Sequence, residues 1–498
     1  MNENGNDQSR RHVLKQDSGS ESSAAVQSPN IIAYIALALW PLVTWLMWRK
    51  LTPAQALIWT ILGGYLLLPP VAAAFNLPVV PDLNKSTIPN LMAFAAALWL
   101  AKDKIGLLPQ SWLGKALILG YVLSPFGTVL TNPDPLFFAQ LSIPGLRLYD
   151  SFAAVAYQAI ALMPFFLARR YLGTPEGMRA IIAALVVAGL AYSVPMIVEA
   201  VMSPQMNVWV YGFFQHDFFQ TMRYGGYRPV VFLPHGLWVA FFACMAAVAA
   251  LTTLRRSPAD QRPKALVVVL YLTAMLVLCR SAGPIIYLLA LTPLILLAPP
   301  RLQIMVAAAM ALVVVTYPIL RGAHLVPVDQ ILDLANGLSP DRAYSLRFRI
   351  ENEEILLARA QERPWFGWGG YGRSFTHDPE TGKALNIADG AWVILMGQYG
   401  WLGYLTEFGL TALPLFLLLR EALRQDSAAL SPWVGAVALI LGANMVDLLP
   451  NATHIPFTWL MAGALLGEAE RLATLHADRT ALARHNALHG GKPLRTVI

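Results

Sequence analysis

The sequence has 498 residues, of which 56% are hydrophobic and only 13% are charged, whereas soluble globular chains carry about 25% charged residues. The deficit comes from long uncharged apolar runs, which are typical of membrane-spanning helices, so we predict an all-α transmembrane bundle. The formal charge of +7 does not indicate a nucleic-acid partner, because the basic residues form short clusters between apolar runs, as topology signals do.

Apolar runs follow one another along most of the chain after a polar tail. Residues 1–30 are rich in Ser, Asn, Gln and Gly, and this composition predicts disorder. Candidate spans then lie at 31–48, 54–74, 86–101, 112–131, 150–168, 179–201, 229–252, 265–279, 282–298, 303–320, 400–419, 431–449 and 456–468. Two of them, at 86–101 and 456–468, are short, so the predicted count is twelve or thirteen.

Basic residues between the spans indicate how the bundle is oriented. They occur on alternate loops, at Arg49/Lys50, Lys102/Lys104, Arg169/Arg170, Arg255/Arg256, Arg262/Lys264, Arg301 and Arg420/Arg424. The positive-inside rule places these loops in the cytoplasm, together with the tail over 469–498. We therefore expect a bundle over 31–320, C-terminal membrane helices over 400–468 and, between them on the opposite side, a large loop over 321–399.

The large loop has internal order, and loops of this length are usually functional. Residues 341–362 read as an amphipathic helix, with Asp341 near its start and Pro364 after its end. A glycine-rich turn with several aromatic residues follows. Its side chains either stack on sugar faces or pack the loop onto the bundle, and the candidates are Trp365, Phe366, Trp368 and Tyr371.

Five arginines on the loop side break the positive-inside rule, and a guanidinium close to hydrocarbon usually has a partner or a function. They are Arg223, Arg228 and Arg280, near span ends, and Arg347 and Arg349, on the loop helix. We expect Arg228, Arg280, Arg347 and Arg349 to converge on one anion, whereas Arg223 is equally well explained by snorkelling or an ion pair. The alternative is ion pairing along the helix, because Arg347 and Glu351, like Arg349 and Glu353, stand four residues apart.

Four residues are candidate proton acceptors. Glu354 shares a helix face with Arg347, which makes it a base or a salt-bridge partner. Asp389, just before the span at 400–419, suits a base, a sugar-hydroxyl acceptor or a helix N-cap. His235 and His377 are further candidate bases, with packing and solvent exposure as their respective alternatives. Neither metal-ligand spacing nor a Walker loop is present, so we predict no metal and no cofactor.

Several of these motifs together resemble the O-antigen ligase/polymerase family over about residues 220–420. They are the arginine before the span at 229, the join Arg280-Ser281-Ala282-Gly283, the helix motif Ser345-x-x-x-Arg349 and the turn Pro364-Trp365-Phe366-Gly367-Trp368-Gly369. The resemblance implies a bacterial inner-membrane glycosyltransferase that acts on undecaprenyl-diphosphate-linked glycans at the periplasmic face. It matches Arg228 and Arg349 to functional arginines, and Arg280 to a basic residue of a Ser-Arg-Gly-like join whose order is inverted here.

The resemblance leaves two activities open. A polymerase transfers the glycan to another lipid-linked repeat unit, whereas a ligase transfers it to a lipid A core or a protein. Ligases carry a loop histidine where this chain has Ala388-Asp389-Gly390, which favours the polymerase. The implied partners are the lipid-linked oligosaccharide, membrane lipids and a chain-length regulator or flippase.

A flippase or exporter of lipid-linked sugars is the alternative from another class of protein. Transporters more often show charged residues within spans and repeated halves. The spans of this chain read as nearly free of charge, and its conspicuous charges lie on one side. This distribution favours chemistry at the membrane interface.

Overall fold

The computed structural model describes residues 28–77, 81–223, 225–338, 340–425 and 430–488, and it confirms the predicted all-α bundle. The predicted disordered tail and the last ten residues of the chain lie almost entirely outside these ranges. Thirteen helices coincide with the predicted spans: α2 (Ile31–Lys50), α3 (Pro53–Leu67), α4 (Thr87–Trp99), α5 (Trp112–Leu130), α6 (Leu148–Tyr171), α7 (Pro175–Met202), α9 (Gly236–Arg256), α10 (Arg262–Leu278), α11 (Ala282–Leu297), α12 (Pro300–Gly322), α15 (Ala391–Arg424), α16 (Pro432–Asp447) and α17 (Pro456–Leu488).

The lengths and apolar character of these helices make the chain a multi-pass membrane protein. Among the described residues, seven helices are long and apolar enough to cross a membrane: α2, α5, α6, α7, α9, α12 and α15. Four shorter apolar helices accompany them: α3, α4, α11 and α16. About 20 helical residues at 1.5 Å per residue span the hydrocarbon core, and in lipid a helix satisfies its own backbone hydrogen bonds.

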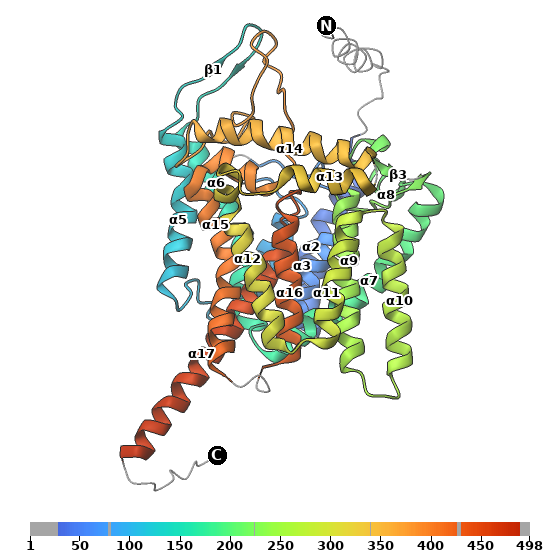
Figure 1. Ribbon diagram of the computed structural model, residues 1–498, viewed down its shortest axis with the longest axis vertical. Helices are drawn as coiled ribbons and strands as arrows, with labels where there is room; N and C mark the ends of the chain where they lie inside the picture. The colour runs from blue at the N-terminus through green and yellow to red at the C-terminus, as the bar shows by residue number, and fades with distance from the viewer. Residues whose placement is uncertain (1–27, 78–80, 224, 339, 426–429, 489–498) are drawn as a thin grey trace.

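One end of the bundle carries nearly all of the remaining structure (Figure 1), and we call it the loop face. Here α13 (Val328–Leu338) and α14 (Pro340–Gln361) lie across the bundle, so the helix predicted over 341–362 is confirmed. The short elements at this end are the strand pairs β1 (Leu136–Phe137) with β2 (Ser142–Ile143) and β3 (Met222–Arg223) with β4 (Gly226–Tyr227), helix α8 (Met206–Tyr211) and the 3-10 turn η1 (Phe218–Thr221).

The helix α15 begins earlier than the predicted start at 400, because the apolar segment 391–399 is also helical. The helix is interrupted at Gly400, whose φ of 62° lies in the left-handed region. The glycine-rich turn fills the interruption: Trp401 N donates to Pro364 O at 2.7 Å, and Trp368 N donates to Gly397 O at 2.8 Å. The turn therefore replaces hydrogen bonds that the helix loses at its kink.

The last helix, α17, continues to Leu488, well beyond the span predicted to end at 468. Its C-terminal half projects from the end of the bundle opposite the loop face (Figure 1). The tail predicted over 469–498 is thus helical as far as the structure describes it.

Candidate anion site at the loop face

Arg228, between β4 and α9, is a buried cation with few partners. Its side chain is 3% exposed, its Nη2 donates to Ser281 Oγ, and its Nε has no hydrogen-bond acceptor. No carboxylate of the described residues lies within ion-pair distance of it. Burial, with nearby Arg223 and Arg349, lowers its pKa to about 10. Burying an unpaired charge is costly, and an anionic ligand would relieve that cost.

Arg349, on α14, is held loosely. Its Nε lies 3.4 Å from Asp389 Oδ2, and its Nη1 lies 3.3 Å from Pro450 O and 3.4 Å from Asn451 Oδ1. Strong charge-assisted hydrogen bonds measure about 2.7–2.9 Å. The guanidinium is therefore available to a better partner. The alternative ion pair between Arg349 and Glu353 along the helix does not form, because Glu353 pairs with Arg321.

A buried carboxylate supports the loop that contacts Arg349. Asp447, at the end of α16, accepts from Asn451 Nδ2 at 3.0 Å and from Thr453 Oγ1 at 2.8 Å. Because both amide hydrogens sit on Nδ2, this contact leaves Asn451 Oδ1 to face the guanidinium of Arg349. Sequence reasoning missed Asp447, although an acid in an apolar run is itself a functional signal.

Asp389 stands immediately before α15, as predicted, but Gly390 occupies the N-cap position and Asp389 does not cap the helix. Its carboxylate is 39% exposed and forms the ion pair with Arg349. The structure thus places an accessible proton acceptor beside a cation. Of the candidate bases, Asp389 is the one in direct contact with the arginine site.

Glu354 belongs to a structural ion pair, the alternative that the sequence left open. Arg321, only 4% exposed, contacts Glu353 Oε1 at 3.0 Å and Glu354 Oε1 at 2.9 Å. Glu353 also accepts from Tyr317 OH at 3.2 Å and from Trp392 Nε1 at 3.3 Å, and burial raises the pKa of its carboxyl against the effect of Arg321. This network fastens α14 onto α12 and α15.

Arg280 contacts the β3–β4 hairpin, and Arg347 lies on a different face of α14 from Arg349. Arg280 donates from Nη1 to Arg223 O at 2.6 Å and packs against Gly226, where a Cβ atom would lie 2.2 Å from its Nη2. It therefore supports the β3–β4 hairpin. Arg347 is exposed on α14, two residues from Arg349 and so on a different face of the helix.

His235 is next to the site and has a structural contact. Its Nδ1 accepts from Leu237 N at 3.0 Å, so it is the N-cap residue of α9. Its ring centroid lies 4.4 Å from that of His216. Burial, together with the charges of Arg228 and His216, lowers the pKa of His235 to about 3. The imidazole is therefore neutral near pH 7, with its proton on Nε2.

His377 is in another part of the loop face. Its ring centroid lies 4.9 Å from that of Phe138, and its backbone forms a bridge with Ala384. Phe138 directly follows β1, which lies at the opposite edge of the loop face from β3 and α8 (Figure 1). The structure does not bring His377 together with Arg228 or Arg349.

Three of the four candidate sugar-contacting aromatics, Trp365, Trp368 and Tyr371, differ in exposure. Trp368 is 7% exposed, with the guanidinium carbons of Arg359 and Arg363 at 3.4 and 4.4 Å from its ring centroid. This geometry favours the packing alternative for Trp368. Trp365 and Tyr371 are exposed, and Tyr371 OH donates to Asp150 Oδ1 at 3.0 Å.

Glu199, in α7, is another buried acid that sequence reasoning missed. Its carboxylate accepts from the backbone N–H groups of Val230 and Val231 at 2.7 Å and of Met206 at 2.9 Å. These bonds fix the chain directly after Arg228, where Val231 has a left-handed φ of 54°. Glu199 thus positions Arg228 without touching it.

No protein-family model matches the chain, and no curated protein is similar to it at a significant level. Arg223 and Arg349 both lie close enough to Arg228 to lower its pKa. Two or more guanidinium groups beside one accessible carboxylate can bind a phosphate-type anion and accept a proton.

Proposed function

We propose that the protein is a polysaccharide polymerase of the bacterial inner membrane, with its active site on the periplasmic face. It transfers a glycan from undecaprenyl diphosphate to a sugar hydroxyl of another lipid-linked repeat unit. The observation that carries this proposal is Arg228, a buried guanidinium without a carboxylate partner among the described residues, whose pKa Arg349 also influences. The motif resemblance to the O-antigen ligase/polymerase family supports the same activity.

The mechanism assigns a separate task to each residue. The acceptor oxygen forms a bond to the anomeric carbon of the donor as the bond from that carbon to the diphosphate oxygen breaks. Arg228 and Arg349 stabilise the charge that develops on the departing diphosphate. Asp389 takes the proton of the acceptor hydroxyl. Because Asp389 pairs with Arg349 at 3.4 Å, a bound diphosphate that engages Arg349 releases the carboxylate for this task.

The geometry supports the polymerase over the ligase. The ligase alternative needs a histidine base. His377 lies away from Arg228 and Arg349, beside Phe138, and His235 accepts a backbone hydrogen bond through Nδ1. The argument against an exporter is weaker than the sequence indicated, because α7, α15 and α16 contain the buried or half-buried acids Glu199, Glu407 and Asp447. Exporter activity therefore remains one outcome of the test.

The test compares arginine variants in a strain that lacks the chromosomal gene. Arg228→Ala and Arg349→Ala should insert into the membrane, yield no long polymer and accumulate single lipid-linked repeat units at the periplasmic face. Arg347→Ala is the matched control, since it removes the same charge from an exposed position of α14. Glycan gels and lipid extracts give the readout.

Normal polymer from either site variant would contradict the arginine mechanism. Long polymer that stays attached to undecaprenyl diphosphate in the deletion strain would indicate a ligase. Repeat units trapped on the cytoplasmic side would indicate a flippase.

A further inference from the structure

A pocket of about 560 Å³ lies between the start of α5, the end of α15 and the middle of α17. This volume is within the range of about 300–1,000 Å³ that is usual for ligand sites. The wall includes Trp112, Leu417, Arg420 and Ala473, and we call the hollow the Arg420 pocket. It is at the end of the bundle from which α17 projects (Figure 1), opposite the loop face and its arginine site.

The wall that α15 contributes changes from apolar to cationic toward the end of the helix. Leu413, Leu417 and Arg420 all line the pocket and follow one another at intervals of four and three residues, so they share one face of α15. At 1.5 Å per residue, Arg420 lies about 10 Å beyond Leu413 along the helix axis. A phospholipid has the same order from the membrane interior outward: an acyl chain and then a phosphate.

The guanidinium of Arg420 is only partly neutralised by its carboxylate partner. It pairs with Glu421 Oε1 at 2.7 Å, and Arg424 pairs with the same oxygen at 3.3 Å. Two guanidiniums that share one carboxylate leave an excess of one positive charge in this group. Glu421 is fully buried, whereas the side chains of Arg420 and Arg424 are 50% and 49% exposed. Arg420 can therefore donate further hydrogen bonds to a phosphate.

The other two walls also suit a lipid headgroup. Trp112, the first residue of α5, is 78% exposed, and tryptophans gather at the headgroup level of membranes. The acid on the wall, Glu470, pairs with Arg169 at 2.6 Å and accepts from Gln110 N at 2.7 Å. Its charge is thus compensated within the protein, and the excess positive charge of the Arg420 group determines which headgroups the pocket attracts.

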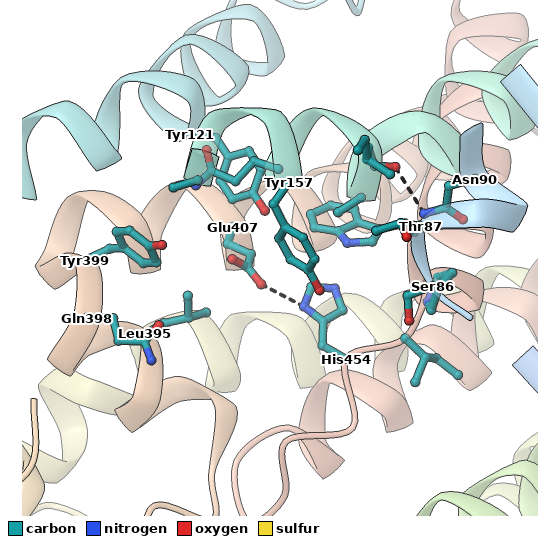
Figure 2. A pocket seen from close by; sticks show the side chains of 17 residues that line it. Ser86, Thr87, Asn90, Tyr121, Tyr157, Leu395, Gln398, Tyr399, Glu407 and His454 are labelled. Atoms are coloured by element: carbon teal, nitrogen blue, oxygen red, sulfur yellow. Dashed lines mark hydrogen bonds and ion pairs between the residues drawn. The ribbon is translucent and has the colours of Figure 1, made fainter. Parts of the chain in front are cut away.

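A second cavity, between α4, α5, α6 and α15, lacks this character (Figure 2). Of the described residues that line it, none is Lys or Arg. Its Glu407 and His454 point toward each other, with His454 Nδ1 2.8 Å from Glu407 Oε1. An anionic headgroup therefore has an arginine to bind in the Arg420 pocket and none on the described wall of this cavity.

We propose that the Arg420 pocket binds an anionic phospholipid of the leaflet opposite the loop face. The lipid phosphate accepts hydrogen bonds from Arg420, one acyl chain lies along Leu417 and Leu413, and Trp112 packs beside the headgroup. Basic pockets between membrane helices bind anionic lipid headgroups. A zwitterionic lipid adds a cation next to the arginines and binds more weakly. The proposal rests on the pocket and its charges, whether or not the protein is a polymerase.

A lipid titration of the purified full-length protein in detergent tests the pocket. The probes are dioleoyl phosphatidylglycerol and dioleoyl phosphatidylcholine, which have the same acyl chains and differ in net charge. Native mass spectrometry measures the bound lipid, and thermal unfolding measures the stabilisation. We expect the wild type to bind the anionic lipid about fivefold more tightly, the effect of one arginine close to an anionic headgroup.

Three variants separate the pocket from the general charge of this end of the bundle. Arg420→Ala should lose the preference for the anionic lipid. Arg170→Ala is the matched control and should keep it, because Arg170 is 56% exposed, pairs with Asp103 at 3.3 Å and does not line the pocket. Ala473→Leu keeps every charge and fills part of the pocket, so it should bind less phosphatidylglycerol. This last variant keeps the test informative if Arg420→Ala folds poorly.

The pattern of binding decides the proposal. A preference for phosphatidylglycerol that Arg170→Ala keeps and Arg420→Ala loses supports the pocket. Equal binding of the two lipids by the wild type, equal losses in the two arginine variants, or full binding by Ala473→Leu would overturn it. Stabilisation by glycerol 1-phosphate as large as that by phosphatidylglycerol would assign the pocket to a soluble phosphate and overturn the lipid. None of these readouts depends on polymer, so failure of the proposed function is a separate result.

Discussion

At the scale of single residues, Arg228 and Arg349 are held in opposite ways. Arg228 is buried and fixed by Ser281, whereas Arg349 is half-exposed and touches its partners only at 3.3–3.4 Å. A rigid guanidinium and an adjustable one together suit an anion that must enter and leave. The rigid one also stores a desolvation cost in the absence of ligand.

Replacing Arg228 should therefore separate stability from activity. Arg228→Met keeps much of the side-chain volume and removes the buried charge, so we expect a thermal midpoint equal to or above that of the wild type, with no polymer formed. Thermal unfolding in detergent and a glycan gel measure the two effects. A variant that is markedly less stable and also inactive would show that Arg228 is a structural residue.

His235 should act as a helix cap whose protonation destabilises the fold. Asparagine is a good N-cap residue, so His235→Asn should keep activity, while His235→Ala should lose about 1 kcal/mol of stability. Loss of transfer by a fully folded His235→Asn variant would restore the histidine as a catalytic candidate.

The low pKa of His235 also predicts a pH dependence. The folded value is about 3, against about 6.5 for an unperturbed histidine. Between these values only the unfolded chain takes up the proton, so the contribution of His235 to stability falls as the pH drops from about 6.5 toward 3. The thermal midpoint of His235→Asn should therefore decrease less between pH 7 and pH 5 than that of the wild type.

At the scale of elements, the interruption of α15 connects the membrane helix to the loop above it. The glycine-rich turn is hydrogen-bonded at the Gly400 kink. It also packs through Phe366 against Gly127 of α5 and through Trp368 against Arg359 and Arg363. Because Asp389 precedes the kink on the same helix, the geometry of the kink sets the position of this residue relative to the rest of the bundle.

Gly400→Ala should disrupt this arrangement. A Cβ atom there would lie 2.5 Å from Pro364 O, and the left-handed backbone adds about 1–3 kcal/mol of strain. We expect a clear loss of thermal stability and of polymer. Gly370→Ala is the matched control, since a Cβ atom meets nothing within 4 Å and the residue has no positive φ; its stability should change by less than about 0.5 kcal/mol. Equal effects of the two substitutions would contradict the role of the kink.

At the scale of the whole molecule, the fold separates a loop face with the arginine site from an opposite end where α17 projects (Figure 1). The basic clusters predict that the loop face is periplasmic. Both native cysteines, Cys244 and Cys279, are buried, so single new cysteines can report the orientation. In cells with a permeable outer membrane, an impermeant thiol reagent should label Lys383→Cys on the loop face and spare Asp478→Cys on α17. The reverse pattern would invert the topology.

The sequence predicted which arginines lie on the loop side but not which of them form the site. The positive-inside violation selected Arg223, Arg228, Arg280, Arg347 and Arg349 alike, because it reports the side of the membrane on which a residue lies. It carries no information on side-chain direction. Only packing distinguishes the buried Arg228 from Arg280, which supports a hairpin, and from the exposed Arg347.

By itself, the sequence determined the helices and their approximate bounds, because a backbone in lipid must satisfy its hydrogen bonds within each apolar segment, and that requirement is local. It also predicted the loop helix and Asp389 just before a span. Only the tertiary structure decided which distant side chains meet: Arg228 with Ser281, 53 residues away, and Glu407 with His454, 47 residues away. Those contacts depend on how helices rotate and pack against one another, and apolar runs of nearly uniform hydrophobicity do not encode that rotation in any local pattern.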